Sequence, residues 1–521
     1  MNSPSPSIRY ESAGTLLAYG PADRLSDALS NLPGSIRRVL AVCAGDREQL
    51  PSPEGAEIVP GVVLEVRGHL GAFRARAAAP GGGVDLGALS PNRNALFDLV
   101  LDLYRTPLID HEVPPLGYAH VYGDKEELKA ALEQLGQLQG EVRKPRYYQF
   151  DEQRCAHDRL GLRGCRACLE VCPAGALCSE AQRIVIDPYL CRGCATCMAV
   201  CPTGALEHAQ YRPEGLLQML GEGIAAEQSQ VAPAPSVLVH ADALDEDLPP
   251  GVVGIEVPTP AVVSSDLWLA ALAMGAAQVL VLAPDGLPNA TAQVLEAELN
   301  RARHWLKALG QVPERIRCVH RLQGVDWAGL PVTWEPVSAA QFIACDGKRE
   351  RLRRAFAVLQ QGACRAMPMR GVPFGRLRID TANCSLCGAC IGVCSPGALS
   401  MRDGSLRYEA WRCTQCGLCA EACPENVLGL EPGLFPDSFL EAEPQTLKAP
   451  EAEFLCVECG KPVGDVALQR ATRSLVADHP IFQGEGAKLL EMCMACRQHR
   501  AAQFSLAAED ADLSSTGRPA D

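Results

Sequence analysis

The sequence has no long apolar run. A membrane-spanning helix needs about 18 consecutive apolar residues, and the closest candidate, residues 267–283, is interrupted by Gln278. The first residues, Met-Asn-Ser-Pro-Ser-Pro-Ser, contain no apolar segment of the signal-peptide type. We therefore expect a soluble cytoplasmic protein without a membrane span.

Basic residues are in deficit. The formal net charge is -14, whereas binding to nucleic-acid phosphates needs a basic face. Several active-site signatures are also missing. No Gly-x-Gly-x-x-Gly or phosphate-loop motif follows a predicted strand, and there is no Ser-His-Asp or Cys-His nucleophile pattern and no flavin or molybdenum fingerprint. We expect no nucleic-acid partner, no small-molecule substrate and no independent catalytic site.

Cysteine, in contrast, is abundant and regularly spaced. The chain has 25 cysteines, and the run Cys-x2-Cys-x3-Cys occurs four times, beginning at Cys165, Cys194, Cys387 and Cys416, with an offset of 29 residues within each pair. A chain of 521 residues that is 47% hydrophobic can build cores without disulfide staples. In a reducing cytoplasm, closely spaced cysteines are more often metal ligands. This rhythm indicates iron–sulfur ligation at two places in the chain.

Three cysteines that are separated from one another by two residues can wrap one four-iron cluster as a tight loop, so a fourth ligand must come from elsewhere. The two segments, residues 155–201 and 384–423, closely resemble two-cluster bacterial ferredoxins, in which the cysteine before the proline ligates the other cluster. In the second segment Ser395 delays this proline to Pro396, and we expect little consequence. The resemblance implies three regular ligand sets: Cys191, Cys194, Cys197 and Cys172; Cys384, Cys387, Cys390 and Cys423; Cys413, Cys416, Cys419 and Cys394.

The remaining set is irregular. The position expected for its first cysteine is Leu162, and the nearest upstream cysteine, Cys155, lies ten residues before Cys165 rather than three. The enlarged loop 156–164 would have to bulge and return Cys155 to the iron. Three interpretations remain open: a three-iron cluster without this ligand, ligation by His157, or the interpretation we favour, a four-iron cluster held by Cys155, Cys165, Cys168 and Cys201.

Two further Cys-x2-Cys pairs lie near the C-terminus. Paired knuckles of this kind suit a structural tetrahedral zinc, and a single rubredoxin-like iron is the main rival. His479 and His499 could replace a thiolate, but surface histidines explain them more simply. The predicted zinc ligands are Cys456, Cys459, Cys493 and Cys496. The other cysteines are out of register, and we expect them to be packed thiols without iron: Cys43, Cys178, Cys318, Cys345 and Cys364.

The N-terminal part predicts a small α/β unit. We expect strands at 39–43 and 62–66, and a helix entered through Ser90 and Pro91 that carries Leu96, Val100 and Leu103 on one face. A second helix opens at Asp124, with Glu127 three residues on, and its apolar face holds Leu128, Leu132 and Leu135.

The middle part predicts alternating strands and helices after a linker that contains Pro213, Pro233 and Pro235. The strands are expected at 236–240, 255–257, 278–283 and 316–319, and the helices at 265–274 and through Leu295, Leu299 and Leu306. This alternation indicates a parallel sheet. A basic run from Lys348 to Arg354 has helical spacing with Leu352, Ala355 and Leu359, and we interpret it as a solvated helix face.

The predicted fold class is therefore α/β plus α+β and multidomain. It combines two pseudo-symmetric β-α-β modules like those of bacterial ferredoxins, two small α/β domains, and a C-terminal segment like a zinc knuckle. The expected domains are an N-terminal α/β domain (1–145), a first ferredoxin-like module (146–212), an α/β domain (213–375), a second module (376–435), a four-cysteine metal-knuckle segment (436–506) and a disordered tail (507–521).

This order is similar to that of large bacterial ferredoxin-type proteins associated with formate dehydrogenases, and the segments around Cys155 and Cys456 carry the similarity. Residues 236–319 faintly resemble the flavodoxin-like delta subunit of hydrogenase and heterodisulfide reductase complexes. The resemblance implies an electron carrier with four [4Fe-4S] clusters between a dehydrogenase, such as formate dehydrogenase, and a downstream acceptor. Two alternatives remain open: a flavin-containing redox subunit, and an iron–sulfur assembly or sensing factor.

Overall fold

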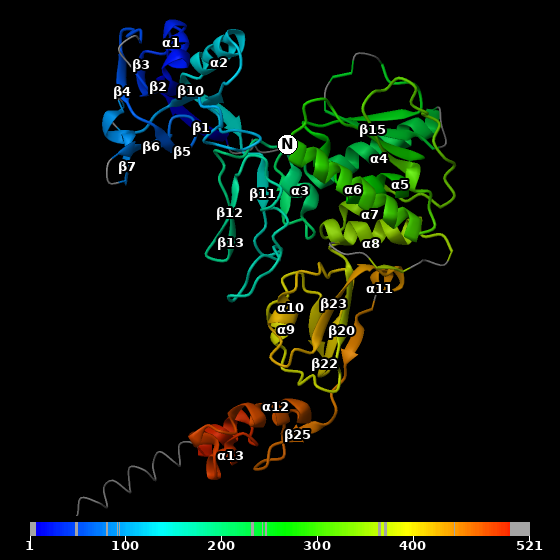
Figure 1. Cartoon of the computed structure of the whole chain (residues 1–521). Coiled ribbons are helices and arrows are strands. Elements are labelled where there is room, and N and C mark those ends of the chain that lie inside the picture. Colours follow the sequence, from blue (N-terminus) through cyan, green and yellow to red (C-terminus); the bar gives the residue numbers. More distant parts are fainter. Residues whose placement is uncertain are drawn as a thin grey trace, which may run out of the picture. The chain divides into compact units, whose positions relative to one another are not determined.

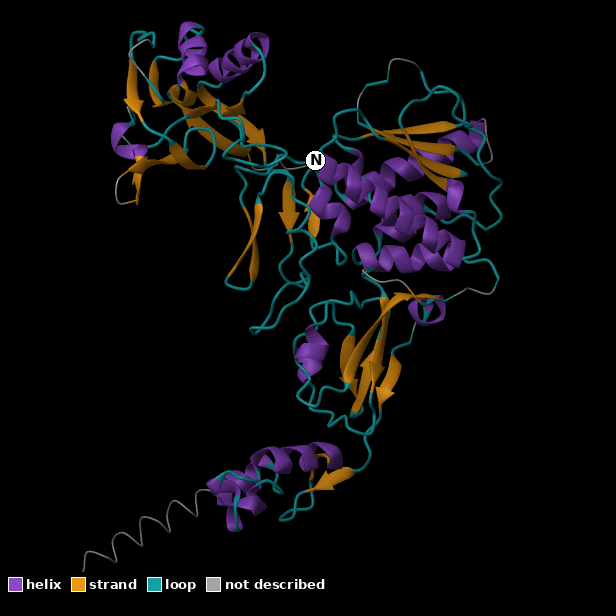
Figure 2. Cartoon of the chain, in the orientation of Figure 1, coloured by secondary structure: helices purple, strands orange, loops and turns teal. Residues whose placement is uncertain are grey.

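A computed structural model of the chain describes residues 7–500, with the exception of 47–49, 80–81, 91, 93, 231–233, 242, 245–246, 363–365, 369–371 and 442. The chain divides into two compact units. The first comprises residues 1–152, 166–304 and 312–345, and the second comprises 153–165, 305–311 and 346–521. Both units mix helices with several small sheets (Figures 1 and 2).

The N-terminal part of the first unit is built on a parallel sheet, as expected for an α/β unit. Its order is β4-β3-β2-β8-β9, and every pairing is parallel. The strands are β2 (Thr15–Pro21), β3 (Arg38–Ala44), β4 (Ala56–Pro60), β8 (Leu99–Asp102) and β9 (Tyr118–His120). The central strands are buried along their length, so they form the core of this part of the chain.

The helix predicted from Pro91 through Leu103 is wrong. Leu99, Val100 and Leu101 form the centre of strand β8 and are fully buried between its neighbours β2 and β9. A short apolar run buried on both faces of a parallel sheet carries no alternation, so its pattern does not distinguish a strand from a buried helix. Pro91 itself lies outside the described residues.

The second predicted helix is confirmed. Helix α2 (Lys125–Gln137) begins after Asp124, whose carboxylate accepts hydrogen bonds from the backbone N–H groups of Glu126 and Glu127, and its buried residues are Leu128, Leu132 and Leu135. The other elements are α1 (Ala22–Ser30), the antiparallel sheet β5 (Val63–Arg67), β6 (Arg74–Ala79) and β7 (Gly82–Asp85), the short helix η1 (Leu86–Leu89), and the antiparallel pair β1 (Ser7–Ser12) and β10 (Gly140–Pro145).

The middle sheet of the first unit confirms the predicted parallel arrangement. Its order is β16-β15-β17-β18, and all three pairings are parallel. The strands are β15 (Ser236–His240), β16 (Val252–Glu256), β17 (Gln278–Leu282) and β18 (Ile316–Val319). The associated helices are α5 (Ser265–Ala273), α6 (Asn289–Ala308), α7 (Ala339–Ile343) and the short η2 (Pro260–Val262) and η3 (Pro313–Arg315).

The predicted linker after the first cysteine-rich segment is helical. Helix α4 (Pro213–Gln230) starts at Pro213 itself. Proline is well tolerated at the first helical position, because its missing N–H would have no partner there and its φ angle already suits a helix. Pro213 therefore marks the start of a helix, while Pro233 lies outside the described residues.

The two cysteine-rich segments share one order of elements, in which two flanking strands pair antiparallel and a hairpin lies between the motifs. In the first unit these are the pair β11 (Tyr148–Phe150) and β14 (Leu206–His208), the hairpin β12 (Leu177–Glu180) and β13 (Arg183–Ile186), and α3 (Thr196–Val200). In the second unit they are β20 (Gly375–Ile379) and β23 (Leu428–Leu434), the hairpin β21 (Leu399–Arg402) and β22 (Ser405–Tyr408), and α9 (Ala389–Gly392) and α10 (Leu418–Glu421).

The second unit also contains α8 (Lys348–Leu359) and the C-terminal elements. Four aromatic rings pack together in it, those of Trp305, Phe356, Phe374 and Phe439. The remaining elements are β19 (Met367–Pro368), α11 (Pro436–Leu440), β24 (Gln445–Lys448), the hairpin β25 (Glu453–Leu455) and β26 (Pro462–Asp465), α12 (Val466–Val476), η4 (Pro480–Phe482) and α13 (Glu485–Leu489). The tail predicted to be disordered, 507–521, lies outside the described residues.

No helix in the described part of the chain combines the length and apolar character needed to cross a bilayer.

Candidate iron–sulfur and metal centres

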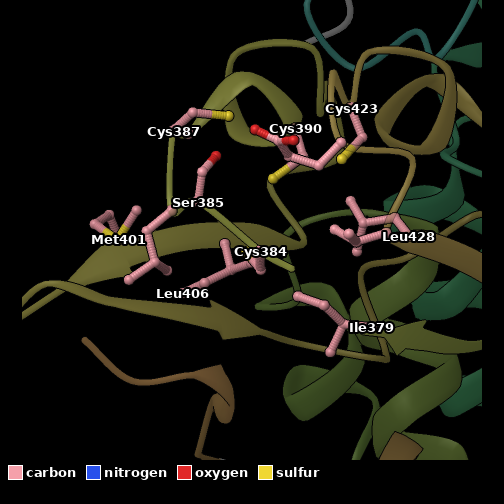
Figure 3. A pocket seen from close by; sticks show the side chains of 13 residues that line it. Ile379, Cys384, Ser385, Cys387, Cys390, Met401, Leu406, Cys423 and Leu428 are labelled. Atoms are coloured by element: carbon pink, nitrogen blue, oxygen red, sulfur yellow. The ribbon is translucent and has the colours of Figure 1, made fainter. Parts of the chain in front are cut away.

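In the second cysteine-rich segment, one cavity brings together the predicted ligand set that begins with Cys384. The cavity is lined by Cys384, Cys387 and Cys390 of one motif and by Cys423 of the other. Figure 3 shows these four cysteines around the cavity, with Ile379 and Leu428 among the apolar residues that close it. A cysteine from 33 residues beyond Cys390 thus completes the set, as the ferredoxin resemblance implies.

A second cavity brings together the complementary set. It is lined by Cys413, Cys416 and Cys419 and by Cys394, which follows the other motif. Its remaining walls are mainly apolar, with Leu377, Leu399 and Leu430 among them. Each motif in this segment therefore contributes three cysteines to one cavity and one cysteine to the other.

The loops between the cysteines share an unusual backbone. In the two loops of the second segment, the residues just before and just after the middle cysteine have positive φ angles: Leu386 and Gly388 in one, and Gln415 and Gly417 in the other. Gly193 and Ala195 repeat this around Cys194. Non-glycine residues rarely adopt this region, so its recurrence indicates a functional constraint. Such turns direct successive N–H groups into one concavity that favours anions.

The first segment assembles the set Cys191, Cys194, Cys197 and Cys172 within the first unit. Burial raises the pKa of the Cys197 thiol well above its ordinary value, and nearby thiolates raise it further, those of Cys194, Cys191 and Cys172 first among them. The same hydrogen bond supports the distant cysteine in both segments: Ala176 N–H donates to Cys172 Sγ at 3.3 Å, and Ala398 N–H donates to Cys394 Sγ at 3.3 Å.

Burial holds these thiols in their neutral form when no metal is present. Desolvation raises the pKa of Cys191 and of Cys394 to about 11 and that of Cys390 to about 12. Iron binds the thiolate form, so loading these sites releases protons, and the bound iron offsets the cost of burying the negative charge. The donor sets therefore fit the iron–sulfur clusters that the motifs imply.

The enlarged loop before Cys165 closes on itself. Arg159 and Leu162 exchange both backbone hydrogen bonds, at 3.1 and 2.8 Å, and Leu160 turns the chain with a φ of 51°. At the base of the loop, Cys165 N–H donates to Ala156 O at 2.8 Å, which brings the chain on either side of the loop together. The loop thus bulges and returns Cys155 toward Cys165, as the four-cysteine interpretation requires.

His157 lies inside this loop, and its side chain is buried. Its Nδ1 is 2.8 Å from Cys165 O, and its Nε2 is 3.6 Å from a carboxylate oxygen of Asp158. Both ring nitrogens therefore face protein oxygens, which disfavours His157 as an iron ligand. Cys155 and Cys165 belong to the second compact unit, whereas Cys168 and Cys201 belong to the first, so this ligand set stays a prediction.

The C-terminal cysteines form a much tighter group. The sulfurs of Cys456, Cys459, Cys493 and Cys496 all lie within 4.8 Å of one another, and this is the only group of three or more potential ligands so close together among the described residues. Cys459 Sγ and Cys493 Sγ are 3.7 Å apart. A tetrahedron with metal–sulfur bonds of about 2.3 Å has an edge of about 3.8 Å. This geometry fits one tetrahedral ion, whereas thiolates around a four-iron cluster lie farther apart.

Local backbone contacts prepare this tight site for metal. Cys456 follows strand β25, and its knuckle is closed by hydrogen bonds from Cys456 N–H to Lys461 O at 2.8 Å and from Gly460 N–H to Cys456 O at 2.9 Å. Cys493 N–H donates to Cys456 Sγ at 3.2 Å, and this bond is the largest cause that lowers the pKa of Cys456 to about 6. A thiolate is therefore available at neutral pH.

The remaining cysteines differ from one another. Cys43 is buried in β3, as expected, and Cys318 and Cys345 are partly buried. Cys178 is exposed in the hairpin strand β12, so its prediction as a packed thiol is wrong. In a two-stranded hairpin one face has no covering layer, and Cys178 lies on the uncovered one. Cys364 lies outside the described residues.

The basic run 348–354 forms the predicted helix, α8, but its interpretation as a solvated face is wrong. Lys348, Arg349 and Arg351 are all buried. The Arg349 guanidinium donates to the backbone oxygens of Trp411 at 2.7 Å and Cys413 at 2.6 Å. Its spacing from Leu352 and Phe356, three and seven residues on, places it on the apolar helix face, and that signal was present in the sequence.

A second buried contact was also missed. Lys144 Nζ donates to Tyr189 O at 2.8 Å and to Cys191 O at 2.7 Å. Burial lowers the pKa of Lys144 to about 8 and that of Arg349 to about 10. No local sequence signal links a lysine at the end of strand β10 to a cysteine 47 residues later.

Comparison with known proteins supports the assignment of the two cysteine-rich segments. Two family models, both described as a 4Fe-4S dicluster domain, match residues 163–205 and 376–424. The chain carries two 4Fe-4S dicluster ferredoxin domains. They confirm an iron–sulfur protein, while Cys155 lies outside the first match. No curated protein matches the chain.

Proposed function

We propose that this chain is an electron-transfer protein that holds four [4Fe-4S] clusters in two ferredoxin modules. The observation that carries the proposal is the pair of cavities in the second module, each lined by three cysteines of one motif and one cysteine of the other. When bound, a [4Fe-4S] cluster accepts and returns a single electron. We find no catalytic triad or nucleotide motif in the sequence, so this chemistry is the function we assign.

The chain's own residues bind each cluster and set its surroundings. Four thiolates hold the irons, and apolar side chains such as Ile379 and Leu428 exclude water from one cavity. Backbone donors such as Ala398 N–H point at the sulfurs. Hydrogen bonds to sulfur and the exclusion of solvent are the means by which a protein adjusts a cluster's reduction potential. The matching hydrogen bond at Cys172 supports a common design of the two modules.

For the irregular cluster we propose Cys155, Cys165, Cys168 and Cys201 as ligands. The closed loop 156–164 supports this, because Cys165 N–H and Ala156 O are joined across its base at 2.8 Å. For the C-terminal group we propose a structural zinc held by Cys456, Cys459, Cys493 and Cys496. Such a site contributes folding free energy and no electron transfer.

The partner we propose is a formate dehydrogenase, because the order of domains and the segments around Cys155 and Cys456 resemble those of proteins associated with that enzyme. The test is anaerobic mixing of the purified chain with a formate dehydrogenase and formate, followed by the visible absorbance of the clusters. We expect bleaching that needs both formate and the enzyme. If the chain bleaches with dithionite but not with formate and the enzyme, the carrier assignment survives and this partner is wrong.

One observation favours an alternative function. The middle sheet has the order β16-β15-β17-β18, which in chain order is the 2-1-3-4 arrangement typical of flavodoxin-like folds. Such folds bind flavin at the carboxyl ends of their strands. A flavin-containing redox subunit would release a yellow cofactor when the purified protein is denatured, whereas the carrier proposal predicts none.

A further inference from the structure

Both ferredoxin modules receive a cation at the same backbone position. In the second module, Arg349 of α8 donates to Trp411 O and Cys413 O. In the first module, Lys144 of β10 donates to Tyr189 O and Cys191 O. Cys413 and Cys191 are each the first cysteine of the second motif, and the other carbonyl lies two residues before it in both cases. The contacts therefore match atom for atom along the two motifs.

The two cations have unrelated origins. One is an arginine on a helix, 64 residues before its cysteine, and the other is a lysine on a strand, 47 residues before its cysteine. Neither residue belongs to a cysteine motif. Repetition of the motif therefore does not explain why both modules have this contact. The same contact made by different residues of different elements therefore indicates a role at the cysteine set.

The charge of Arg349 is not neutralised locally. Its guanidinium donates a third hydrogen bond to Pro373 O at 2.8 Å and lies 4.1 Å from the centre of the Phe374 ring. No ion pair joins Arg349 to a carboxylate in the part of the chain that the structure describes. A buried positive charge in apolar surroundings acts strongly on nearby charges, because little solvent screens it.

Lys144 is in a similar position. Its ammonium group is half-buried, 5.2 Å from the centre of the Tyr10 ring, and no ion pair involves it among the described residues, while the Arg192 guanidinium and the Asp187 carboxylate act on it at longer range with opposite signs. The complementary set of the second module differs. There Lys448 acts on Cys384, but its ammonium group pairs with a carboxylate oxygen of Glu451 at 2.8 Å. In the second module, the arginine next to the Cys413 set therefore has no carboxylate partner, whereas the lysine next to the Cys384 set has one.

We propose that Arg349 and Lys144 are positioning residues that raise the reduction potentials of the clusters held by the Cys413 set and the Cys191 set. The inference rests on the proposed function. Reduction adds one electron, and so one negative charge, to the site. A fixed positive charge next to a ligand stabilises the reduced form more than the oxidised form. Strand β10 and helix α8, which carry these residues outside the cysteine motifs, would thereby help to set the reduction potentials.

The test is an EPR-monitored redox titration of the full-length protein, purified anaerobically, with dithionite as the reductant. We expect Arg349→Met and Lys144→Met each to shift one one-electron step to a lower potential. The expected change is about tenfold in the equilibrium constant for reduction, or about 59 mV for one electron. Arg349→Lys and Lys144→Arg keep the charge and restore most of the shift.

Two matched controls each remove a nearby arginine whose charge is already paired with a carboxylate. Arg412 neighbours Cys413 but pairs with Glu409 at 3.2 Å, and Arg143 neighbours Lys144 but pairs with Glu141. Arg412→Gln and Arg143→Gln should leave the potential of every one-electron step unchanged. Unshifted steps in both methionine variants, with iron content equal to that of the wild type, would overturn the inference.

Iron content separates this inference from the proposed function. A wild-type protein without iron–sulfur clusters contradicts the proposed function, whereas loaded variants with unshifted potentials contradict the inference alone. If Arg349→Met loses iron, Arg349→Gln replaces it, because the amide still offers a donor to the carbonyls while the charge is removed. The half-buried Lys144 supplies the independent second measurement.

Discussion

The backbone N–H of Cys165 donates a 2.8 Å hydrogen bond to the carbonyl oxygen of Ala156 and so closes the loop that separates Cys155 from its motif. Gly164 N–H reinforces the closure by donating to Asp158 Oδ1 at 2.9 Å. The loop also contacts its own compact unit, since Arg163 N–H donates to Glu421 Oε2 at 3.0 Å. The loop thereby holds Cys155, the proposed ligand, at the start of the irregular motif.

Replacement of Cys155 tests whether this loop delivers a ligand. We expect Cys155→Ser to lose about one iron atom per chain and to show the EPR signal of an oxidised three-iron cluster, because one corner of the cube loses its thiolate. Iron analysis and EPR of the oxidised protein give the result. Cys178→Ser is the control, since this exposed cysteine belongs to no ligand set. An unchanged four-iron protein would exclude Cys155 as a ligand.

The exchange of cysteines between motifs has a distinct signature in double variants. Cys384 and Cys423 line one cavity, whereas Cys413 lines the other. We expect the Cys384→Ser, Cys423→Ser double variant to lose at most about four iron atoms per chain and to keep the EPR signal of the other cluster, because both residues hold the same cluster. The Cys413→Ser, Cys423→Ser double variant should lose the sum of the iron lost by its two single variants, because each residue holds a different cluster. Iron loss that is additive in the first pair, but not in the second, would contradict the exchange.

The C-terminal site should hold its metal independently of the clusters. Cys459→Ser removes one corner of a group whose sulfurs lie within 4.8 Å of one another. We expect loss of about one zinc per chain with cluster iron unchanged, and a lower free energy of unfolding for the C-terminal segment. Elemental analysis gives both metals, with Cys318→Ser as the control. If the variant loses one iron and no zinc, the zinc assignment is wrong.

His208 predicts a pH dependence of stability in the first module. Its buried ring accepts hydrogen bonds at Nδ1 from the N–H groups of Gln210 and Tyr211, and burial lowers its pKa to about 4. The unfolded chain takes up a proton near pH 6.5, where the folded form does not. The contribution of the neutral His208 ring to the free energy of unfolding is therefore fully present above about pH 6.5. It falls toward pH 4, by at most about 1.4 kcal/mol per pH unit.

Hydrogen exchange of residues 147–212 between pH 7.5 and pH 5.5 measures this slope. His208→Asn keeps an acceptor for the two N–H groups but cannot take up a proton in this range, so its slope should be smaller than that of the wild type. Equal slopes in the two proteins would show that His208 does not couple folding to protonation. The comparison cancels any acid lability that the clusters contribute, because both proteins carry them.

Where local chemistry decides the structure, the sequence predicts it well. The Asp124 cap and the spacing of Leu128, Leu132 and Leu135 identify α2, because a cap and an amphipathic face are local signals. The strand at 316–319 has the predicted bounds. The cysteine spacing likewise predicts the three cysteines that each motif contributes to its own cavity, whereas the fourth cysteine of each cavity follows from the resemblance to two-cluster ferredoxins.

Where tertiary contacts decide, the sequence misleads. The run around Val100 has the composition of either a strand or a buried helix, and only its parallel neighbours select the strand β8. The charged run at Arg349 resembles a solvated face, yet the carbonyl oxygens of Trp411 and Cys413 satisfy the guanidinium inside the protein. The spacing of Arg349 from Leu352 and Phe356 indicates the apolar helix face, but its contacts join residues 62 and 64 positions apart, so no local pattern reveals its partners.

The count of iron and acid-labile sulfide in anaerobically purified protein tests the central claim most directly. Four [4Fe-4S] clusters predict about 16 iron and about 16 sulfide per chain, with reduced-state EPR signals of four-iron clusters. A count of about eight or fewer, with both cysteine-rich segments intact, would contradict the account of two modules with two clusters each.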